Sequence, residues 1–441
     1  MLLTSCDPDQ KDPVIRFMVA EPGHFHAALV LKTMYADVDR QVDVFAPEGP
    51  ELNDFLTRIE SYRLREDDPV DWTVRTITGA GFFDRMIREK PGNVLILAGN
   101  NRNKTEYIGR VIENGIHVFA DKPMAINQDD FHLLESAFKM AERNGLLLYD
   151  IMTERFEIAN ILQKELSQVP EIFGQLQPGT PGDPAVIKES VHHFSKKVSG
   201  TQLVRPPWFF DVEQEGEGIV DVTTHLVDLV QWSCFPGQVI DYKQDIRITG
   251  ARTWTTAITP TQFRQVTGLP NYPDYLGKDV DSDSILQVAS NGEIKYQIKG
   301  LNVRVSVTWA YQAEEGGGDT HFSRMVGSAA SLEIRQGAEQ GFKPELYVIP
   351  VKKGEDYGRI LAAAVQGLAG RYPGLSVAES DDGYRVIIPN ELREGHEAHF
   401  ARVTENFLQY LKAGRLPEWE VPNMLAKYWL TTSAREMARG E

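Results

Sequence analysis

Two short stretches of the sequence contain residues that could together oxidise a carbinol. One is the hexapeptide ADKPMA at 120–125, which contains Lys122, and the other runs from 218 to 228. Asp221 and His225 are four residues apart, so a helix would bring both side chains to one face. A lysine ammonium can hydrogen-bond the reacting oxygen, and an imidazole can exchange its proton near neutral pH. The two stretches predict Lys122, His225 and Asp221 as catalytic residues.

The elements around these residues must bring them to one edge of a sheet. An apolar segment at 116–120 predicts a strand, and it places Lys122 at the carboxyl end, where open α/β sheets bind ligands. Each motif alone also has a structural explanation. A Lys-Pro pair is common in loops, and an Asp and a His one turn apart often share a structural hydrogen bond. The catalytic explanation is favoured because the two motifs occur together, about a hundred residues apart.

This combination, behind a strand–helix alternation, resembles the glucose–fructose oxidoreductase / inositol dehydrogenase / MocA-like (Gfo/Idh/MocA) family. There the first motif usually reads Glu-Lys-Pro and the second Asp-x-x-x-His. The resemblance runs from about Val14 to Trp232, with weaker support to the C-terminus. It implies an NAD(P)-dependent oxidoreductase acting on a carbinol of a sugar, cyclitol or glycoside, with Lys122 between nicotinamide and substrate and with Asp121 and Pro123 beside the cofactor. A cationic nicotinamide would lower the pKa of Lys122.

The glycine-rich turn that holds a pyrophosphate is reduced in this sequence. The turn after the first predicted strand is EPGHFH at 21–26, with one glycine, Gly23, where the G-x-G-x-x-G fingerprint has three. Gly23 permits close backbone approach, and the following helix offers its N-terminus to a phosphate. His24 and His26 could donate to phosphate or could cap and pack the helix. We expect all three residues to bind the cofactor.

Three further residues are expected on the cofactor side. Glu48 follows the second predicted strand, where an acid would bind the adenine ribose and favour NAD over NADP, although a solvated loop acid would also suit this position. Asn100 and Asn101 follow the fourth predicted strand, and the family resemblance places Asn101 beside the nicotinamide. The expected cofactor is therefore NAD, with NADP as the less favoured choice.

Five residues are expected on the substrate side. The resemblance places Arg155 at the domain junction, although this arginine could instead cap a helix. Trp208 could stack on a pyranose or lie in the core. His192, His193 and His321 lie in polar segments that could contact a sugar or form ordinary connections.

No metal ion is expected. The candidate ligands that we considered are His192, His193, Asp221 and His225. Two adjacent histidines on a strand point to opposite faces, so this set does not converge.

The alternation of apolar strands and helices over the first 150 residues predicts a parallel sheet with right-handed crossovers. Beyond 150, long strand-rich stretches such as 303–309 alternate with period two, which is typical of antiparallel strands. The predicted fold class is α/β plus α+β, with an N-terminal Rossmann-type parallel sheet and a C-terminal α+β domain on a large, mostly antiparallel sheet. The expected boundaries are a leader at 1–13, a dinucleotide-binding domain at 14–150, and a substrate domain at 151–441 with an added segment near 352–389 and C-terminal helices.

Composition limits the classes of partner. The chain has 441 residues and a formal net charge of −17, which argues against nucleic acid or an anionic membrane surface as partner. No apolar run approaches the roughly 20 residues that span a bilayer. We expect a small-molecule substrate and a homo-oligomer formed through the C-terminal sheet.

The segment at 3–6, Leu-Thr-Ser-Cys, resembles the end of a bacterial lipoprotein signal, in which the cysteine is lipidated. It predicts a periplasmic or outer-membrane lipoprotein anchored through Cys6. No basic segment and no full apolar core precede it. A cytoplasmic protein is expected if Met1 is the true start, and Cys6 is then an incidental residue of a leader.

Two alternatives to net oxidation remain open. The same residues could serve a redox-neutral NAD-dependent epimerase or glycosidase that keeps its cofactor and returns the hydride. The reduced glycine turn also permits a non-catalytic saccharide-binding lipoprotein, although such a protein has no need of Lys122, Asp221 and His225 together.

Overall fold

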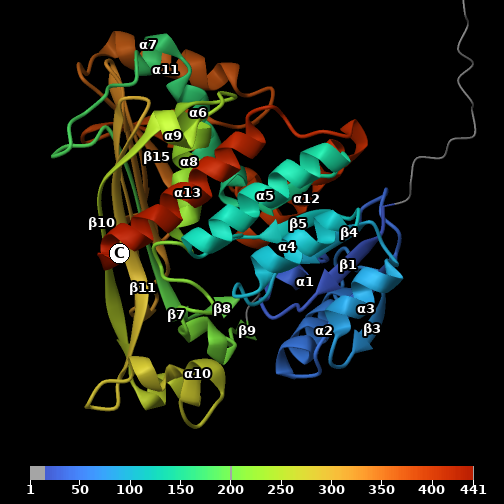
Figure 1. Cartoon of the computed structure of the whole chain (residues 1–441). Helices are drawn as coiled ribbons and strands as arrows, with labels where there is room; N and C mark the ends of the chain where they lie inside the picture. The colour runs from blue at the N-terminus through green and yellow to red at the C-terminus, as the bar shows by residue number, and fades with distance from the viewer. Residues whose placement is uncertain (1–14, 199–200, 441) are drawn as a thin grey trace, which may run out of the picture.

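Two β-sheets form the frame of the molecule, with helices packed around them (Figure 1). The computed structural model describes residues 15–198 and 201–440, so the predictions for the 1–13 leader and for Cys6 lie outside the described residues. Within these ranges, no helix is both long enough and apolar enough to cross a membrane.

The first sheet has six strands in the order β3-β2-β1-β4-β5-β6, and every neighbouring pair is parallel. The strands are β1 (Phe17–Ala20), β2 (Gln41–Ala46), β3 (Thr73–Thr78), β4 (Val94–Leu97), β5 (His117–Asp121) and β6 (Leu148–Ile151). β1, β4 and β6 are buried along their whole length, as is usual for a parallel sheet between layers of helices. The order reverses between β1 and β4, which is where such sheets bind ligands. The predicted Rossmann-type sheet is confirmed.

Five helices connect these strands. They are α1 (His26–Val30), α2 (Pro50–Arg63), α3 (Phe82–Glu89), α4 (Lys104–Glu113) and α5 (Gln128–Asn144). The sequence predicts a helix over 24–35, but α1 covers only His26–Val30. The Tyr35 hydroxyl donates a hydrogen bond of 2.8 Å to the Val30 carbonyl, so the chain turns back over the helix end instead of extending it.

The second sheet has nine strands in the order β10-β11-β12-β7-β13-β14-β15-β17-β16. The strands are β7 (Val186–Ser195), β10 (Ile246–Ile258), β11 (Leu286–Ile298), β12 (Leu301–Gln312), β13 (Thr320–Val326), β14 (Ala330–Gln336), β15 (Glu345–Pro350), β16 (Ser376–Ser380) and β17 (Gly383–Ile387). β12 and β7 pair in parallel, and all other neighbours are antiparallel. The predicted large, mostly antiparallel sheet is therefore confirmed. A small ribbon is formed by β8 (Lys197–Val198) and β9 (Thr201–Gln202).

The remaining helices pack around this sheet or link it to the first. They are α6 (Ile158–Ser167), α7 (Pro170–Phe173), α8 (Thr223–Cys234), α9 (Tyr242–Asp245), α10 (Pro260–Thr267), α11 (Glu355–Gly367), α12 (His396–Ala413) and α13 (Glu420–Arg439), with the short 3-10 turns η1 (Glu154–Phe156), η2 (Pro207–Phe210), η3 (Asp274–Asp279), η4 (Ala338–Gln340) and η5 (Asn390–Leu392). The segment near 352–389 contributes α11, strand β17 and the edge strand β16. The sequence predicts a strand from 239, but β10 begins only at Ile246. The residues before it form α9 instead, because Asp241 caps that helix by accepting a hydrogen bond from the Lys243 N–H at 2.9 Å.

The C-terminal helices complete both hydrophobic cores. Phe400 and Phe407 of α12 belong to the core of the first sheet, where the Phe407 ring stacks on that of Phe119 at a centroid distance of 4.6 Å. α13 contributes Tyr428 to the first core and Leu430 to the second. The sequence grouped these helices with the second sheet, whereas the apolar face of α12 packs on the first.

Candidate active site

A cavity of about 1210 Å³ lies between the two sheets. It is lined by the β1–α1 loop, the end of β5, the segment leading into α8, strands β7 and β12, the β12–β13 loop and the start of α12. Lys122, Asp221 and His225 all line this cavity. Residues about a hundred positions apart are therefore brought to one space from both sheets.

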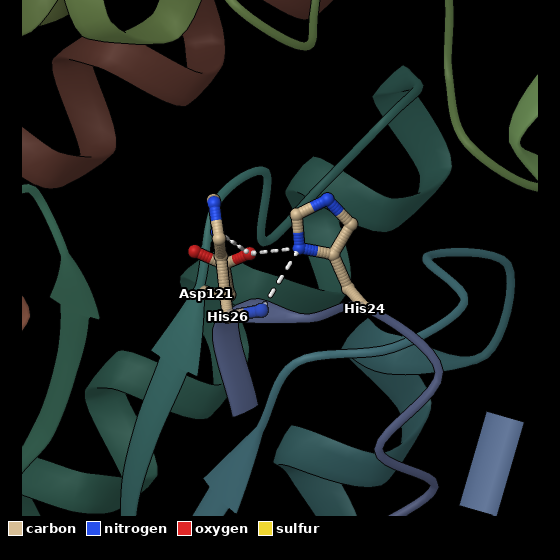
Figure 2. Close-up of side chains that lie close together, drawn as sticks. All are labelled: His24, His26 and Asp121. Atoms are coloured by element: carbon tan, nitrogen blue, oxygen red, sulfur yellow. Dashed lines mark hydrogen bonds and ion pairs between the residues drawn. The ribbon is translucent and has the colours of Figure 1, made fainter. Parts of the chain in front are cut away.

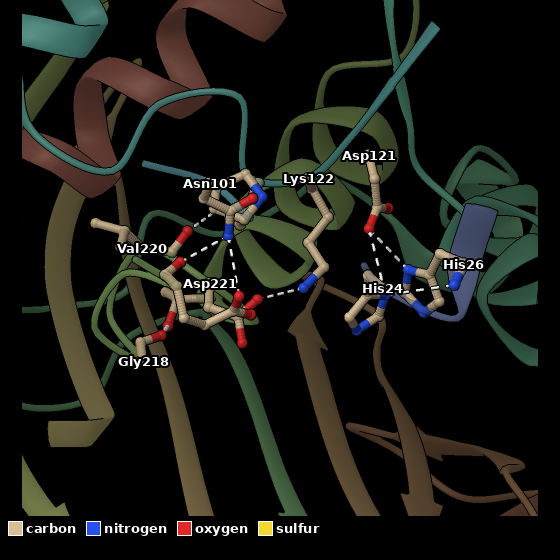
Figure 3. A network of polar contacts seen from close by, with 12 residues as sticks. His24, His26, Asn101, Asp121, Lys122, Gly218, Val220 and Asp221 are labelled. Atoms are coloured by element: carbon tan, nitrogen blue, oxygen red, sulfur yellow. Dashed lines mark hydrogen bonds and ion pairs between the residues drawn. The ribbon is translucent and has the colours of Figure 1, made fainter. Parts of the chain in front are cut away.

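Lys122 directly follows β5 and forms a buried ion pair with Asp221 (Figure 3). The peptide bond between Lys122 and Pro123 is cis. Burial lowers the pKa of Lys122, but the carboxylates of Asp221, Asp121 and Glu215 outweigh burial and raise it above its ordinary value. The sequence predicted a lowered pKa beside a cationic nicotinamide. In the structure the facing carboxylates keep the ammonium charged.

Asp221 and His225 reach the cavity from the start of α8. The predicted helix included Asp221, but α8 begins at Thr223. The turn before α8 is nevertheless helical, since the Thr224 N–H donates to the Asp221 carbonyl at 3.2 Å. Nδ1 of His225 has no hydrogen-bond partner among the described residues. Burial, followed by the charge of Lys122, holds the pKa of His225 well below its ordinary value. The imidazole is therefore neutral near pH 7.

The two asparagines predicted to face the nicotinamide are engaged by the second half of the chain. Asn100 Nδ2 donates to Gln214 Oε1 at 2.7 Å, and Asn101 Nδ2 donates to the Glu215 carbonyl at 2.7 Å. Burial, followed by the charge of Asp221, raises the pKa of Glu215 well above its ordinary value. Both amides therefore hold the two halves of the chain together at the edge of the first sheet.

The turn after β1 is closed by the protein's own atoms. The Gly23 N–H donates to the Glu21 carbonyl at 2.7 Å, and the His24 N–H donates to the Ala98 carbonyl at 3.0 Å. A Cβ on Gly23 would lie 3.1 Å from the Trp208 ring, so the indole covers the glycine. Two backbone donors that would hold a pyrophosphate are therefore paired. In this conformation the turn does not fit the pyrophosphate of a dinucleotide.

Two acids lie near the same edge. Glu48 is exposed just beyond β2, where it accepts a hydrogen bond from Thr78 Oγ1 at 3.2 Å and does not line the cavity. Glu21 has a φ of 47°, and burial, followed by the charge of Glu51, raises its pKa to about 7. The position of Glu48 suits a ribose contact, whereas ionised Glu21 would repel a phosphate.

His24, His26 and Asp121 meet at the wall of the cavity (Figure 2). Asp121 Oδ2 lies 2.9 Å from His26 Nδ1 and 3.8 Å from His24 Nδ1. Burial is the main reason that the pKa of each histidine lies well below the ordinary value. The charge of His26 lowers the pKa of His24 further, and the charge of His396 lowers the pKa of His26 further. The sequence placed these residues on the cofactor side without predicting that they converge.

The substrate-side predictions divide into two groups. His192, His193 and His321 line the cavity. Asp319 lies between His192 and His193, with its carboxylate 3.4 Å from His192 Nδ1 and 2.8 Å from His193 Nδ1. Lys196 Nζ lies 2.9 Å from the same carboxylate. Burial raises the pKa of Asp319, but the hydrogen bond from His192 and the charge of Lys196 outweigh it and hold the pKa well below its ordinary value.

Arg155 and Trp208 do not line the cavity. Arg155 is buried in a bidentate pair with Asp228 at 2.6 and 2.7 Å, and it also bonds Glu420 at 2.9 Å. Trp208 is buried against Gly23. Trp208 therefore agrees with its alternative as a core residue, whereas Arg155 neither lines the cavity nor caps a helix but forms buried ion pairs.

Sequence reasoning missed several cavity residues, among them His396, His399 and Glu154. His396 and His399 begin α12 three residues apart, and Glu154 lies in η1. Burial, followed by the charge of Glu157, raises the pKa of Glu154 to about 7. The i, i+3 spacing of the two histidines was a usable signal, but nothing local indicates that α12 reaches a cavity formed mainly by distant residues.

The six-stranded parallel sheet, the large mostly antiparallel sheet and the cavity between them define the two-part fold that the family resemblance implied. Residues 162–439 match the family described as "Putative oxidoreductase C terminal domain". A solved structure described as "a putative oxidoreductase from Parabacteroides merdae" is 52% identical, with a TM-score of 0.94 over 97% of this chain and 98% of that chain. The chain therefore belongs to this oxidoreductase family.

More distant structures share the fold. KijD10, a 3-ketoreductase from Actinomadura kijaniata in complex with TDP-benzene and NADP, is 14% identical, with a TM-score of 0.56 over 96% of this chain and 98% of that chain. GenD2 from gentamicin A biosynthesis, in complex with NAD, is 14% identical, with a TM-score of 0.57 over 100% of this chain and 98% of that chain. No curated protein matches the chain.

Proposed function

We propose that this protein is a glucose–fructose oxidoreductase-like enzyme and that it oxidises a carbinol of a sugar, cyclitol or glycoside bound in the cavity. The observation that carries the proposal is the convergence of Lys122, Asp221 and His225 on one cavity. These residues supply a charged hydrogen-bond donor, its counter-ion and a neutral base, which are the groups that proton transfer from a carbinol requires.

The residues of this chain account for the proton of the reaction. Lys122 donates a hydrogen bond to the carbinol oxygen and stabilises negative charge as it develops there. His225 accepts the hydroxyl proton, because its side chain lines the cavity and burial keeps its imidazole neutral. Asp221 balances the charge of Lys122 and orients its ammonium. In the reverse direction, the protonated imidazole returns the proton to a carbonyl oxygen.

The polar wall formed by β7 and the β12–β13 loop suits a substrate with several hydroxyls. His192, His193, Asp319 and Lys196 offer charged and neutral partners side by side. Trp309, which also lines the cavity, adds an apolar surface that could pack on a sugar ring. KijD10 is named as a 3-ketoreductase, which supports chemistry between a carbinol and a carbonyl group.

The hydride acceptor that we propose is a nicotinamide dinucleotide, because the first sheet is of the Rossmann type and the KijD10 and GenD2 structures contain NADP and NAD. Glu48 favours NAD. Binding at the edge of β1 requires the Trp208 segment to move away from Gly23, since the turn is closed in this conformation.

The test begins with the cofactor. The purified protein is unfolded and its supernatant analysed for nucleotide, and the folded protein is titrated calorimetrically with NAD(H) and NADP(H). We expect NAD(H) to be released or bound. A sugar panel with C–H-deuterated substrates then separates net oxidation, which forms free NADH, from a redox-neutral cycle, which retains deuterium in the product.

A non-catalytic saccharide-binding protein is the second candidate, and the closed turn favours it. It predicts sugar binding by calorimetry with neither nucleotide bound nor released. That combination would remove the oxidoreductase chemistry while leaving the cavity as the ligand site.

A further inference from the structure

Three side chains of metal-ligand type converge where a dinucleotide fold would hold its phosphates (Figure 2). The ligand atoms of His24, His26 and Asp121 all lie within 4.8 Å of one another. Nitrogen and oxygen ligands that share one Zn²⁺ at about 2.0–2.2 Å are themselves roughly 3–4 Å apart. The spacing of the three ligand atoms is therefore close to the spacing that one shared ion requires.

We propose that His24, His26 and Asp121 bind a divalent transition-metal ion of the zinc type. Two imidazoles and one carboxylate are the protein ligands of catalytic zinc sites and of facial-triad iron sites, both of which keep positions open for water or substrate. The proposal rests on this geometry and ligand chemistry, and it does not depend on the proposed carbinol oxidation.

The ligands are held by rigid parts of the fold. The backbone N–H of His24 is anchored to the carbonyl of Ala98, just after β4, at 3.0 Å. His26 is the first residue of α1, and its ring packs at 4.6 Å from that of Phe400. Asp121 is the last residue of β5. Ligands placed at strand and helix ends in this way are pre-positioned for one ion.

The nearby cations are directed to other acceptors. Lys122 points to Asp221, whereas the carboxylate of Asp121 points the other way, toward the histidines (Figure 3). Lys104 Nζ donates to the backbone carbonyls of Asp121 and Pro123 at 3.0 and 3.2 Å. The Asp121 carboxylate is thus engaged by histidines and not by an ammonium, as a metal ligand would be.

The site is open to the cavity. His24 and His26 line it on the same wall as Lys122. The open coordination positions of the ion would therefore face the space proposed for the substrate, and a water or a hydroxyl or carbonyl oxygen could occupy them.

The experiment uses the full chain purified without a histidine tag and stripped with a chelator. Zn²⁺ alone is titrated calorimetrically, and Co²⁺ alone is followed by its visible absorption. We expect one ion per chain and a Co²⁺ spectrum typical of nitrogen and oxygen ligands. His24→Ala and Asp121→Asn should each weaken binding at least 10-fold. Because His26 is buried, His24→Ala, at a partly exposed position, is the primary variant, with circular dichroism as the check of folding.

His192→Ala is the matched control, because His192 lines the same cavity outside the cluster. We expect it to bind Zn²⁺ as the unmodified chain does. Absence of stoichiometric binding, or unchanged binding in His24→Ala and Asp121→Asn, overturns the proposal. Loss of binding in His192→Ala alone would also overturn it, by placing the ion at the cluster of His192, His193 and Asp319.

Discussion

The chemistry of the cavity depends on which of its buried groups carry charge. Lys122 and Asp221 form an ion pair, whereas burial keeps His225 neutral. Replacing a buried ion pair by apolar residues is often neutral or stabilising, so stability alone gives little reason to keep one. The pair is therefore better explained by what Lys122 does in the cavity.

Replacing His225 by Ala should lower kcat by about two to four orders of magnitude, the usual contribution of a positioned acid or base. Lys122→Ala should have an effect of similar size. Steady-state kinetics with the substrate found in the sugar panel, and circular dichroism for folding, provide the measurement. His132→Ala, at an exposed position of α5, is the control and should keep full activity. Full activity in a folded Lys122→Ala, His225→Ala double variant would place the chemistry elsewhere.

Glu21→Gln should change how stability depends on pH. The folded-state pKa of Glu21 is about 7 against an ordinary value of 4.5, so the folded protein binds the extra proton between these values and loses stability as pH rises through them. The variant should match the unmodified protein at pH 4 and exceed it by about 1–3 kcal/mol at pH 8. Urea unfolding at both values measures this, with Glu66→Gln at an exposed acid as control. An equal difference at both pH values would contradict the pKa assignment.

Local sequence patterns predicted the elements that depend on local physics. The sequence predicts a strand at Gln41–Ala46 and a helix at Ile158–Ser167, and strand β2 and helix α6 have these bounds. Both elements follow from the spacing of apolar residues within the segment itself. The limits of α1 depended on the Tyr35 hydroxyl, which no periodicity reveals. The convergence of His24, His26 and Asp121 depended on the order of strands β1, β4 and β5, which a strand pattern does not specify.

Helix α12 also depends on contacts between distant parts of the chain, because it completes the core of the first sheet. Phe407→Ala removes a ring stacked on Phe119 in the first core, so it should lower the free energy of unfolding by about 3–5 kcal/mol. Gln409→Ala, exposed on the same helix, should change it by less than about 0.5 kcal/mol. Denaturant titration compares the two. A loss below 1 kcal/mol for Phe407→Ala would show that α12 does not complete the first core.

A buried network of charges joins the first sheet to helices α8 and α13, which pack on the second sheet. Lys427 of α13 is fully buried between Asp150 of β6, at 2.6 Å, and Asp228 of α8, at 2.8 Å. Arg155 extends the network to Glu420. Because the two sheets are connected through these helices as well as through apolar contacts, the walls of the cavity should move together.

Lys427→Met should lower the free energy of unfolding by about 3–5 kcal/mol, because it leaves the buried carboxylate of Asp150 without its ammonium partner. Lys412→Met, which removes an exposed pair with Asp37, should cost less than about 1 kcal/mol. Hydrogen exchange of β6 and α8 should accelerate together in the first variant. Acceleration confined to one of them would show that the network does not couple the sheets.

The position of α12 also has a consequence for synthesis. The strands of the first sheet end at Ile151, but the helix that finishes its core begins at His396. At 5–20 residues per second a ribosome needs roughly 12–50 s to cover that interval. During this time the nascent N-terminal half exposes the apolar surface that Phe400 and Phe407 later cover. A helix made long after the first sheet is thus required before the core of that sheet can close. The early translation product therefore depends on whatever shields that surface in the cell.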